Sequence, residues 1–441
     1  MFAARAFGAA RLSASIVRSL VVVSLLALAC ACFASDASAH RHAHAHHRTH
    51  HHHVKAVSAR HRKRSTTTTT TAPAPTTTTT TAPAPAPTTT TTTTAPAPAP
   101  ATTTPAPTTL GGWDGFGVGN WPTASWRPYA DSSPFNQSAL GAQVVPSSAG
   151  IVSSVLQWGN PGNLVDAAGA TNDWAHPTYY AQPTDPIFTL KPLKGSMVLN
   201  GLQIRIPNDA KPAAGGDGHM TVVEPDGWEY DFWQVQSKPL GGGTLTFNGG
   251  GRTRIDGDGR GSFGTAAGFG NLAGMIRAQE LAAGHIDHAL FIVVKCAGKA
   301  TNYGYGVTQS SNTSDSAYVY PATHGASTCG STDPNLPPAG ARFRLAMSDA
   351  QIAALPGPQW QKTILTALAH YGGYVGDTGG SGFNFMFEDS TMYTSFGQPD
   401  PLAAFAKANN VPTWNGQYVF HVADNVNWAQ YLQVIAPPPT A

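Results

Sequence analysis

The segment Asp217–Trp233 constrains the fold more than any other part of the chain, because it has the pattern of a β-hairpin. Pro225-Asp226-Gly227 lies at its centre, and this combination is typical of a tight turn. Proline presets φ, aspartate bonds to the local backbone, and glycine accepts a positive φ. A three-residue loop closed by a glycine bulge pairs Glu224 with Trp228 and fixes the register of both strands.

Side chains alternate along each strand of such a hairpin, so the register assigns them to two faces. One face carries the polar residues and one indole: Asp217, His219, Thr221, Glu229, Asp231 and Trp233. The other face carries Met220, Val222, Tyr230 and Phe232. A two-residue turn would shift the register by one position and mix the two groups, so the three-residue loop is favoured.

The polar face, interpreted as a solvent-facing sheet surface, holds the groups of a carbohydrate site. Paired carboxyls can divide the acid and base roles of glycoside hydrolysis, and a flat aromatic ring can stack on a sugar. The alternative is the ordinary solvated face of an antiparallel strand pair, where polar residues are expected. The sequence leaves both interpretations open.

The first 39 residues have the pattern of an export signal peptide. Basic residues precede an apolar run over 20–31, and Ala37-Ser38-Ala39 offers a cleavage site before His40. The apolar run is too short to cross a bilayer, so we expect no integral membrane span. We therefore expect a secreted, extracellular protein, with association to the cell wall as an option.

Cleavage after Ala39 would leave Cys296 and Cys329 as the remaining cysteines. Export into an oxidising compartment favours a disulfide between them, with two buried free thiols as the alternative. The bond would close a loop of about 30 residues and contribute about 3 kcal/mol on a chain-entropy basis. We expect it to hold Tyr303, Tyr305 and Asn312 near one rim of the domain.

Two low-complexity segments follow the signal peptide. Residues 40–64 are rich in His and Arg; such tracts bind transition metals or stay solvated, and we expect disorder rather than a dedicated metal site. Residues 65–109 consist almost entirely of Thr, Pro and Ala, which predicts an extended linker or stalk. Neither segment has the composition to bury a core.

The chain is basic up to about residue 109 and acidic beyond it. Ten of the 26 basic residues and one of the 24 acidic residues precede residue 110, which leaves 16 against 23 and a net charge of −7. A mildly acidic domain argues against nucleic acid as the ligand. We expect one large, monomeric domain over 110–435, followed by a disordered tail over 436–441.

Short β-rich runs between turn signals predict an all-β domain. The expected strands are Ser196–Pro207, His219–Val223, Glu229–Val235, Gly243–Phe247, His288–Lys295, Ala317–Pro321 and Ala341–Ala346. Glycine triplets at 241–243 and 249–251 are expected to separate strands. The expected fold is a two-sheet β-sandwich of jelly-roll type with a few peripheral helices.

Three helix signals interrupt the β pattern. Ser348-Asp-Ala-Gln351 has the form of a capping box, and 359–371 follows Pro358 with one apolar stripe and stops at Gly372. Asp400-Pro401 is expected to begin a third helix that runs to about Lys407. These helices are expected at the periphery of the sandwich.

Other polar clusters are candidate sites. Asp256 and Asp258 lie in a D-x-D-G loop that suits Ca²⁺ only if further oxygens come from elsewhere, so an ordinary turn is favoured. His285, Asp287 and His288 open a strand, where His285 and Asp287 share a face and His288 points to the other. His288 could equally be a core histidine.

Two further candidates stand alone in the sequence. His324, near Cys329, is similarly ambiguous between a functional and a core histidine. Asp377 lies in a loop-like segment typical of functional carboxylates.

Several stretches resemble a family of exported, largely uncharacterised β-sandwich proteins of soil bacteria and some eukaryotes, often joined to carbohydrate-related modules. The stretches are NLAGMIRAQELAAGHIDHALFIVVK, YVYPATHGAS, DPNLPPAGARFRLAM and HYGGYVGDTGGSG, within residues 215–381. The family pattern G-x-I-x-H-A-L matches Gly284 to Leu290, and D-x-H followed by Y-[D/E] matches Asp217, His219, Tyr230 and Asp231. The resemblance implies a site that contains Asp217, His219, Asp231 and His288.

The leading hypothesis is therefore a secreted carbohydrate-active protein that hydrolyses a polysaccharide or cell-wall glycan with a carboxylate pair and no cofactor. The expected catalytic residues are Asp217, His219, Asp231 and His288; the expected substrate-binding residues are Glu229, Trp233, His324 and Asp377. One alternative is a polysaccharide lyase with His219 as base and Tyr230 as acid, although Tyr230 is expected to face away from His219. The other is a non-enzymatic glycan-binding or adhesion module on its stalk.

Overall fold

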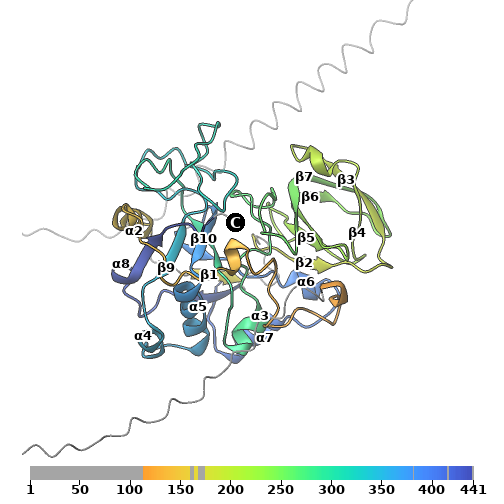
Figure 1. The fold of residues 1–441 in the computed structure, drawn as a ribbon. Helices are drawn as coiled ribbons and strands as arrows, with labels where there is room; N and C mark the ends of the chain where they lie inside the picture. Colours follow the sequence, from red (N-terminus) through yellow and green to blue (C-terminus); the bar gives the residue numbers. More distant parts are fainter. Residues whose placement is uncertain (1–112, 159–162, 167–173, 381, 415–416, 440–441) are drawn as a thin grey trace, which may run out of the picture. The chain divides into compact units, whose positions relative to one another are not determined.

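The computed structural model describes residues 113–158, 163–166, 174–380, 382–414 and 417–439, all within one compact unit, Ala97–Ala441. The fold is sheet-rich, with short helices among the strands (Figure 1). The expected signal peptide, His- and Arg-rich segment and Thr/Pro/Ala-rich linker lie outside the described residues. Within the described ranges, no helix is both long enough and apolar enough to span a membrane.

The largest sheet has six strands in the order β2-β5-β6-β7-β3-β4 (Figure 1). They are β2 (Thr178–Tyr180), β3 (Ile187–Pro192), β4 (Gln203–Arg205), β5 (Met220–Val223), β6 (Trp228–Ser237) and β7 (Gly243–Arg254). β5, β6 and β7 form an antiparallel meander, whereas β2 pairs parallel with β5 and β3 pairs parallel with β7. A 3-10 helix, η3 (Met197–Leu199), lies between β3 and β4.

The register of the central hairpin is the one the sequence predicts. Thr221 pairs with Asp231, and the Glu224 amide donates to the Trp228 carbonyl at 2.9 Å. Gly227 has φ +85°, the conformation that the bulge requires and that glycine adopts without strain. The turn chemistry therefore fixes which residues share a face.

A five-stranded sheet has the order β11-β8-β10-β9-β14. Its strands are β8 (Leu290–Val294), β9 (Arg342–Leu345), β10 (Gly373–Thr378), β11 (Asn384–Phe385) and β14 (Leu432–Ile435). β8 and β10 pair in parallel, while the other pairs are antiparallel. A small third sheet contains β1 (Asn163–Asp166), β13 (Gln417–His421) and β12 (Thr413–Trp414) in that order.

The described helices are short: α2 (Ser148–Leu156), α3 (Ala278–Ala283), α4 (Asp349–Ala353), α5 (Gln359–His370), α6 (Thr391–Thr394), α7 (Pro401–Ala408) and α8 (Trp428–Tyr431). Two further 3-10 helices are η1 (Trp113–Gly115) and η2 (Pro134–Asn136). Three sequence signals are confirmed. Ser348 and Gln351 form the capping box of α4, α5 occupies the predicted stripe, and Asp400 caps α7 through the Ala403 amide.

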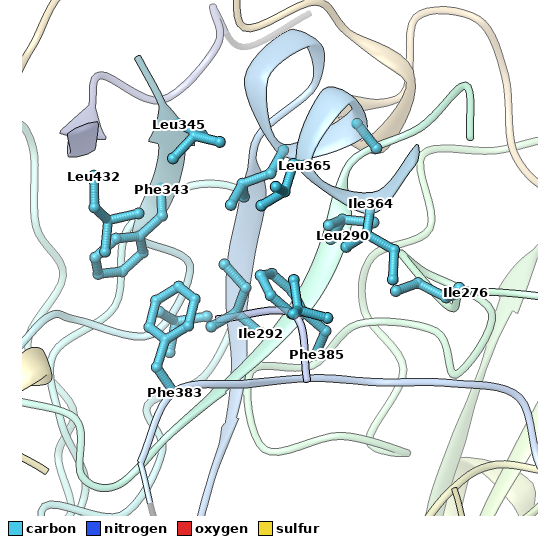
Figure 2. Packing of buried hydrophobic residues seen from close by; sticks show 14 of the residues in the cluster. Ile276, Leu290, Ile292, Phe343, Leu345, Ile364, Leu365, Phe383, Phe385 and Leu432 are labelled. Carbon is cyan, nitrogen blue, oxygen red and sulfur yellow. The ribbon is translucent and has the colours of Figure 1, made fainter. Parts of the chain in front are cut away.

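Both faces of the five-stranded sheet are buried. Ile364 and Leu365 of α5 pack over Leu290 and Ile292 of β8 in one core cluster (Figure 2). The opposite side contributes Phe291 and other residues to a second cluster, shared with the six-stranded sheet. Each such fully buried apolar side chain contributes about 1.5–3 kcal/mol, so the two clusters supply the main stabilisation of the domain.

Several fold predictions need correction. The expected jelly roll is not confirmed, because three strand pairs among the described residues are parallel. Gly249 to Gly251 do not separate strands but lie inside β7, where a Cβ at Gly250 would clash with the Asp231 carbonyl and one at Gly251 with the Phe263 amide. Of the expected strand Ser196–Pro207 only β4 is a strand, and Ala317–Pro321 forms isolated bridges.

The disulfide between Cys296 and Cys329 is confirmed, with a Cα–Cα distance of 5.7 Å. It joins the end of β8 to a loop of turns and isolated bridges. The expectation that both tyrosines of this loop lie at a rim is wrong for Tyr303, which is 1 % exposed and packs in the core. Tyr305 is only partly buried, and its hydroxyl bonds to Gln143.

Candidate functional site

The polar face of the β5–β6 hairpin is buried, which overturns the expectation of a solvent-facing surface. Thr221, Glu229 and Asp231 have no exposed surface, and His219 is 5 % exposed. The segment 262–272 covers this face, and its glycines allow the close approach. A Cβ at Gly264 would lie 2.5 Å from the Asp231 Cβ. The sequence showed which side chains share the face but not what lies over it.

Asp231 is surrounded by hydrogen-bond donors. Its carboxylate accepts from Thr221 Oγ1 at 3.0 Å, from Ser262 Oγ at 2.6 Å and from the Asn271 amide at 3.3 Å. Burial raises its pKa to about 6, although these donors act in the opposite direction. With its oxygens occupied by protein groups, Asp231 is suited to hold neighbouring elements rather than to contact a substrate.

Glu229, two positions away on the same face, is the second buried acid. It accepts the Tyr129 hydroxyl at 2.7 Å and the Leu272 amide at 3.0 Å. Burial, followed by the charge of Asp231, raises the pKa of Glu229 well above its usual value. Burial and the neighbouring carboxyl therefore both favour the protonated form of Glu229.

His176 also lies at this face, although no local sequence pattern marks it. Its ring centroid lies 4.3 Å from that of His219, and its Nδ1 lies 3.4 Å from the Asn271 carbonyl. The parallel register of β2 with β5, which pairs Thr178 with Thr221, brings the two histidines side by side. Nothing local in the sequence signals a parallel neighbour, so this residue could not be found from the hairpin pattern.

Both histidines are neutral at neutral pH. Burial lowers the pKa of His219 to about 4, and burial together with His219 lowers that of His176 well below its usual value. His219 Nδ1 is buried and has no hydrogen-bond partner among the described residues. A neutral imidazole can accept or donate one hydrogen bond through such a nitrogen.

Five partly or fully exposed side chains border the buried face, and we call them the rim: Asp217, Trp233, Phe263, His324 and Asp377. Trp233 Nε1 donates to Asp217 Oδ1 at 3.1 Å. The Phe263 ring, 51 % exposed, contacts the His324 ring at a centroid distance of 4.3 Å. Three of these residues, Trp233, His324 and Asp377, were predicted to bind substrate, and Phe263 was missed.

Asp217 lies in a bend before β5 and Asp377 lies in β10, and the two acids interact electrostatically. Burial, and in the same direction the charge of Asp217, raises the pKa of Asp377 to about 6. The segment 262–268 lies beside Asp377, because the Ala267 amide donates to the Gly376 carbonyl, and it also holds His324, whose amide donates to the Ala267 carbonyl. No ion pair with Lys or Arg includes either aspartate among the described residues.

His288 belongs to a different polar cluster, which we call the helix cluster: Arg277, Glu280, His288, Glu388 and Tyr393. His288 Nε2 lies 3.0 Å from Glu280 Oε1, and its Nδ1 lies 2.9 Å from the Ala289 carbonyl. These contacts are those of a buried core histidine. A cavity of about 10 Å³, the size of one water molecule, lies beside it.

The remaining candidates have local partners. Asp256 bonds to Arg254 at 2.8 Å through both oxygens, and Asp258 pairs with Arg260 at 3.4 Å. His285 Nδ1 lies 3.1 Å from Asp287 Oδ2, but both residues lie in the loop before β8 rather than on one face of a strand. In the part of the chain that the structure describes, no group of three or more His, Cys, Asp or Glu residues is arranged to hold a metal ion.

Comparisons with protein-family models, with curated proteins and with solved structures returned no match.

Proposed function

We propose that this protein is an exported glycoside hydrolase that acts on an extracellular polysaccharide, with Asp217 and Asp377 as its carboxyl pair. The observation that supports this proposal is the electrostatic interaction of two partly buried acids, Asp217 before β5 and Asp377 in β10, near a half-exposed aromatic ring. Glycoside hydrolysis requires a carboxylic acid to protonate the leaving oxygen and a carboxylate on the other side of the bond. Asp377, with its pKa raised to about 6, suits the acid role.

This carboxyl pair is not the one predicted from the sequence, in which Asp231 was the partner of Asp217. Asp231 is fully buried and its oxygens accept three protein hydrogen bonds, so it is assigned a positioning role. Trp233 orients Asp217 through its indole nitrogen. Phe263 is the ring whose exposure suits stacking on a sugar.

A polysaccharide lyase is less well supported. Tyr230 pairs with Val222 on the face opposite to Asp231, so it is not placed to act together with His219. Lyases that act on uronic acids also require a cationic or neutralising group at the substrate carboxylate. The rim carries two acids and no described ion pair with Lys or Arg.

The test is to digest a panel of plant, fungal and bacterial wall polysaccharides with the full chain and with the variants Asp217→Asn and Asp377→Asn. We expect new reducing ends from one glycan, and a loss of roughly 100-fold or more in rate for each variant, the scale of acid–base catalysis. Asp424→Asn, which changes an exposed aspartate, is the matched control and should keep full activity.

Three other outcomes would contradict the proposal. Full activity in both variants would show that Asp217 and Asp377 are not the catalytic carboxyl pair. Products that absorb in the ultraviolet indicate elimination and a lyase. Binding to an insoluble glycan without release of soluble sugar indicates the non-enzymatic binding module.

The pH profile gives an independent check on the acid. Because Asp377 must be protonated to act as the acid, the rate should fall as pH rises through about 6. The Asp377→Asn variant should lose that limb of the profile. A wild-type rate that stays constant from pH 5 to pH 8 would assign the acid role to another group.

A further inference from the structure

A short loop between β3 and β4 exposes three large apolar side chains. Leu193 is 51 % exposed, Met197 is 70 % exposed and Val198 is 62 % exposed. They lie within six consecutive residues at the end of the β3–β4 pair, and we call residues 191–198 the apolar loop. Isolated exposed apolar side chains are ordinary, but several in one short loop point to a surface that is covered by a partner.

The backbone holds these side chains in place. The amides of Leu193 and Lys194 donate to the carbonyls of Phe247 and Asn248 at 2.8 and 3.0 Å, so the loop continues the pairing of β3 with β7. Ser196 Oγ accepts the Gly250 amide at 2.9 Å. On either side of the loop, Leu190 and Leu199 are buried in the core. The exposure therefore belongs to an anchored loop rather than to a frayed one.

The loop is basic in a domain that is acidic. Lys191 and Lys194 are exposed on either side of Leu193 in the sequence. The stretch 186–206 contains these two lysines and Arg205 but no acidic residue, whereas the chain beyond residue 109 has a net charge of −7. The neighbouring parts of β6 and β7, 233–236 and 246–250, contain no acidic residue either.

The acid that contacts β4 lies away from the loop. Glu224 accepts the amide of Arg205 at 2.6 Å, and Arg205 pairs with Ile187 at the start of β3, the end opposite to the apolar loop. Positive charge and apolar surface therefore coincide at one end of the β3–β4 pair.

We propose that the apolar loop docks on an anionic lipid bilayer. Leu193, Met197 and Val198 would enter the boundary between headgroups and acyl chains, while Lys191 and Lys194 would meet the phosphates. Two lysines give only a modest electrostatic attraction to an anionic surface, so the docking is weak and reversible. A protein partner fits less well, because a stable protein interface needs about 800 Å² per side and three side chains provide only a part of that area.

Vesicle sedimentation tests the proposal with the full chain. We expect binding to vesicles of phosphatidylcholine with phosphatidylglycerol, and weaker binding to phosphatidylcholine alone. Changing Leu193, Met197 and Val198 to serine should weaken the partition constant roughly tenfold or more, since the apolar area no longer transfers into lipid. The variant Lys191→Glu/Lys194→Glu should weaken it similarly at about 0.1 M salt and less at higher salt.

Matched controls lie elsewhere on the molecule. Leu140 is 63 % exposed and Lys407 is exposed, so Leu140→Ser/Lys407→Glu makes the same kind of change outside the loop and should leave binding unchanged. Every variant keeps residues 40–64, so a difference between variants reports the loop whatever the His- and Arg-rich segment contributes. An unchanged melting temperature shows that a variant is folded.

Insertion can be measured directly. Relative to wild type, the variant Val198→Trp should gain fluorescence that brominated lipids quench, whereas the added fluorescence of Leu140→Trp should not be quenched. The proposal is overturned if the loop variants bind vesicles as wild type does, or if the two tryptophans are quenched equally. Loss of binding in the controls as well would show that the effect is not specific to the loop and would also overturn it.

Discussion

The hairpin face and the helix cluster both bury acids, but they compensate the charge in opposite ways. Glu229 and Asp231 on the hairpin face are surrounded by neutral donors, and burial raises the pKa of both. In the helix cluster, burial alone would raise the pKa of Glu280, but the Arg277 guanidinium, 2.6 Å away, and His288 hold it at about 2. Buried acids become neutral by taking a proton unless a cation lies beside them.

The largest effect on stability is expected at Arg277. Replacing it with methionine keeps most of the side-chain volume but leaves Glu280 buried without its main cation. We expect a loss of about 3–5 kcal/mol in the free energy of unfolding at pH 7, measured with urea. The double variant Arg277→Met/Glu280→Leu should recover most of the loss. A loss below about 1 kcal/mol in the single variant would mean that the ion pair does not hold the cluster.

A change in pH should have an intermediate effect on the free energy of unfolding. Burial raises the folded-state pKa of Asp231 from 3.8 to about 6 and raises that of Glu229 well above its usual value, so the folded state binds protons more tightly than the unfolded state. Their contribution to stability is therefore complete below about pH 4 and decreases as pH rises through 6 and above. Glu280 acts oppositely: its contribution is complete above about pH 4.5 and is lost as pH falls towards 2.

The variant Glu229→Gln separates the contribution of Glu229 to the pH dependence of stability from that of Asp231. Glutamine stays neutral at every pH, so the variant should lose part of the decline in stability that wild type shows as pH rises. Measured from about pH 5 to pH 9, the free energy of unfolding of the variant should increase relative to that of wild type, because burial and Asp231 oppose the ionisation of Glu229 in the folded wild type. A variant that remains parallel to wild type across this range would show that Glu229 does not hold the proton.

The smallest effect on stability is expected from the neutral hydrogen-bond donors around Asp231. Thr221→Val removes a hydroxyl that donates to Asp231 and accepts from Asn271, and should lower the free energy of unfolding by about 2 kcal/mol at pH 7. Thr363 is a matched control, because its hydroxyl is also buried but bonds to the Gln359 carbonyl in α5. Thr363→Val should lower stability by less than about 1 kcal/mol. Equal effects would remove the special role of the donors around Asp231.

Local sequence predicted local structure well where turns and caps specify it. The register of β5 with β6, the capping box at Ser348 and the start of α7 at Asp400 all depend on residues close in the chain. The prediction was wrong where a remote segment decides the outcome. Gly249 to Gly251 resemble a turn in isolation, but they lie in a strand because the backbones of β6 and the 262–268 segment pass against them.

The same limit holds for the site. The hairpin pattern indicated Asp217, His219, Asp231 and Trp233, because alternation along a strand is a local property. It could not indicate that His176 lies against His219, since that depends on a parallel strand about forty residues away. It could not pair Asp217 with Asp377 either, because Asp377 lies in β10, about 160 residues further along the chain.

By itself the sequence determined the hairpin register, the helix caps and the two cysteines that form the disulfide, because these follow from turn chemistry, backbone geometry and composition. Only the tertiary structure decided that the polar face of the hairpin is buried, that His288 pairs with Glu280, and that Asp217 and Asp377 interact. The physical reason is that the charge state and exposure of a side chain depend on what packs over it. That covering is supplied by segments distant in the chain, whose pairing no local pattern records.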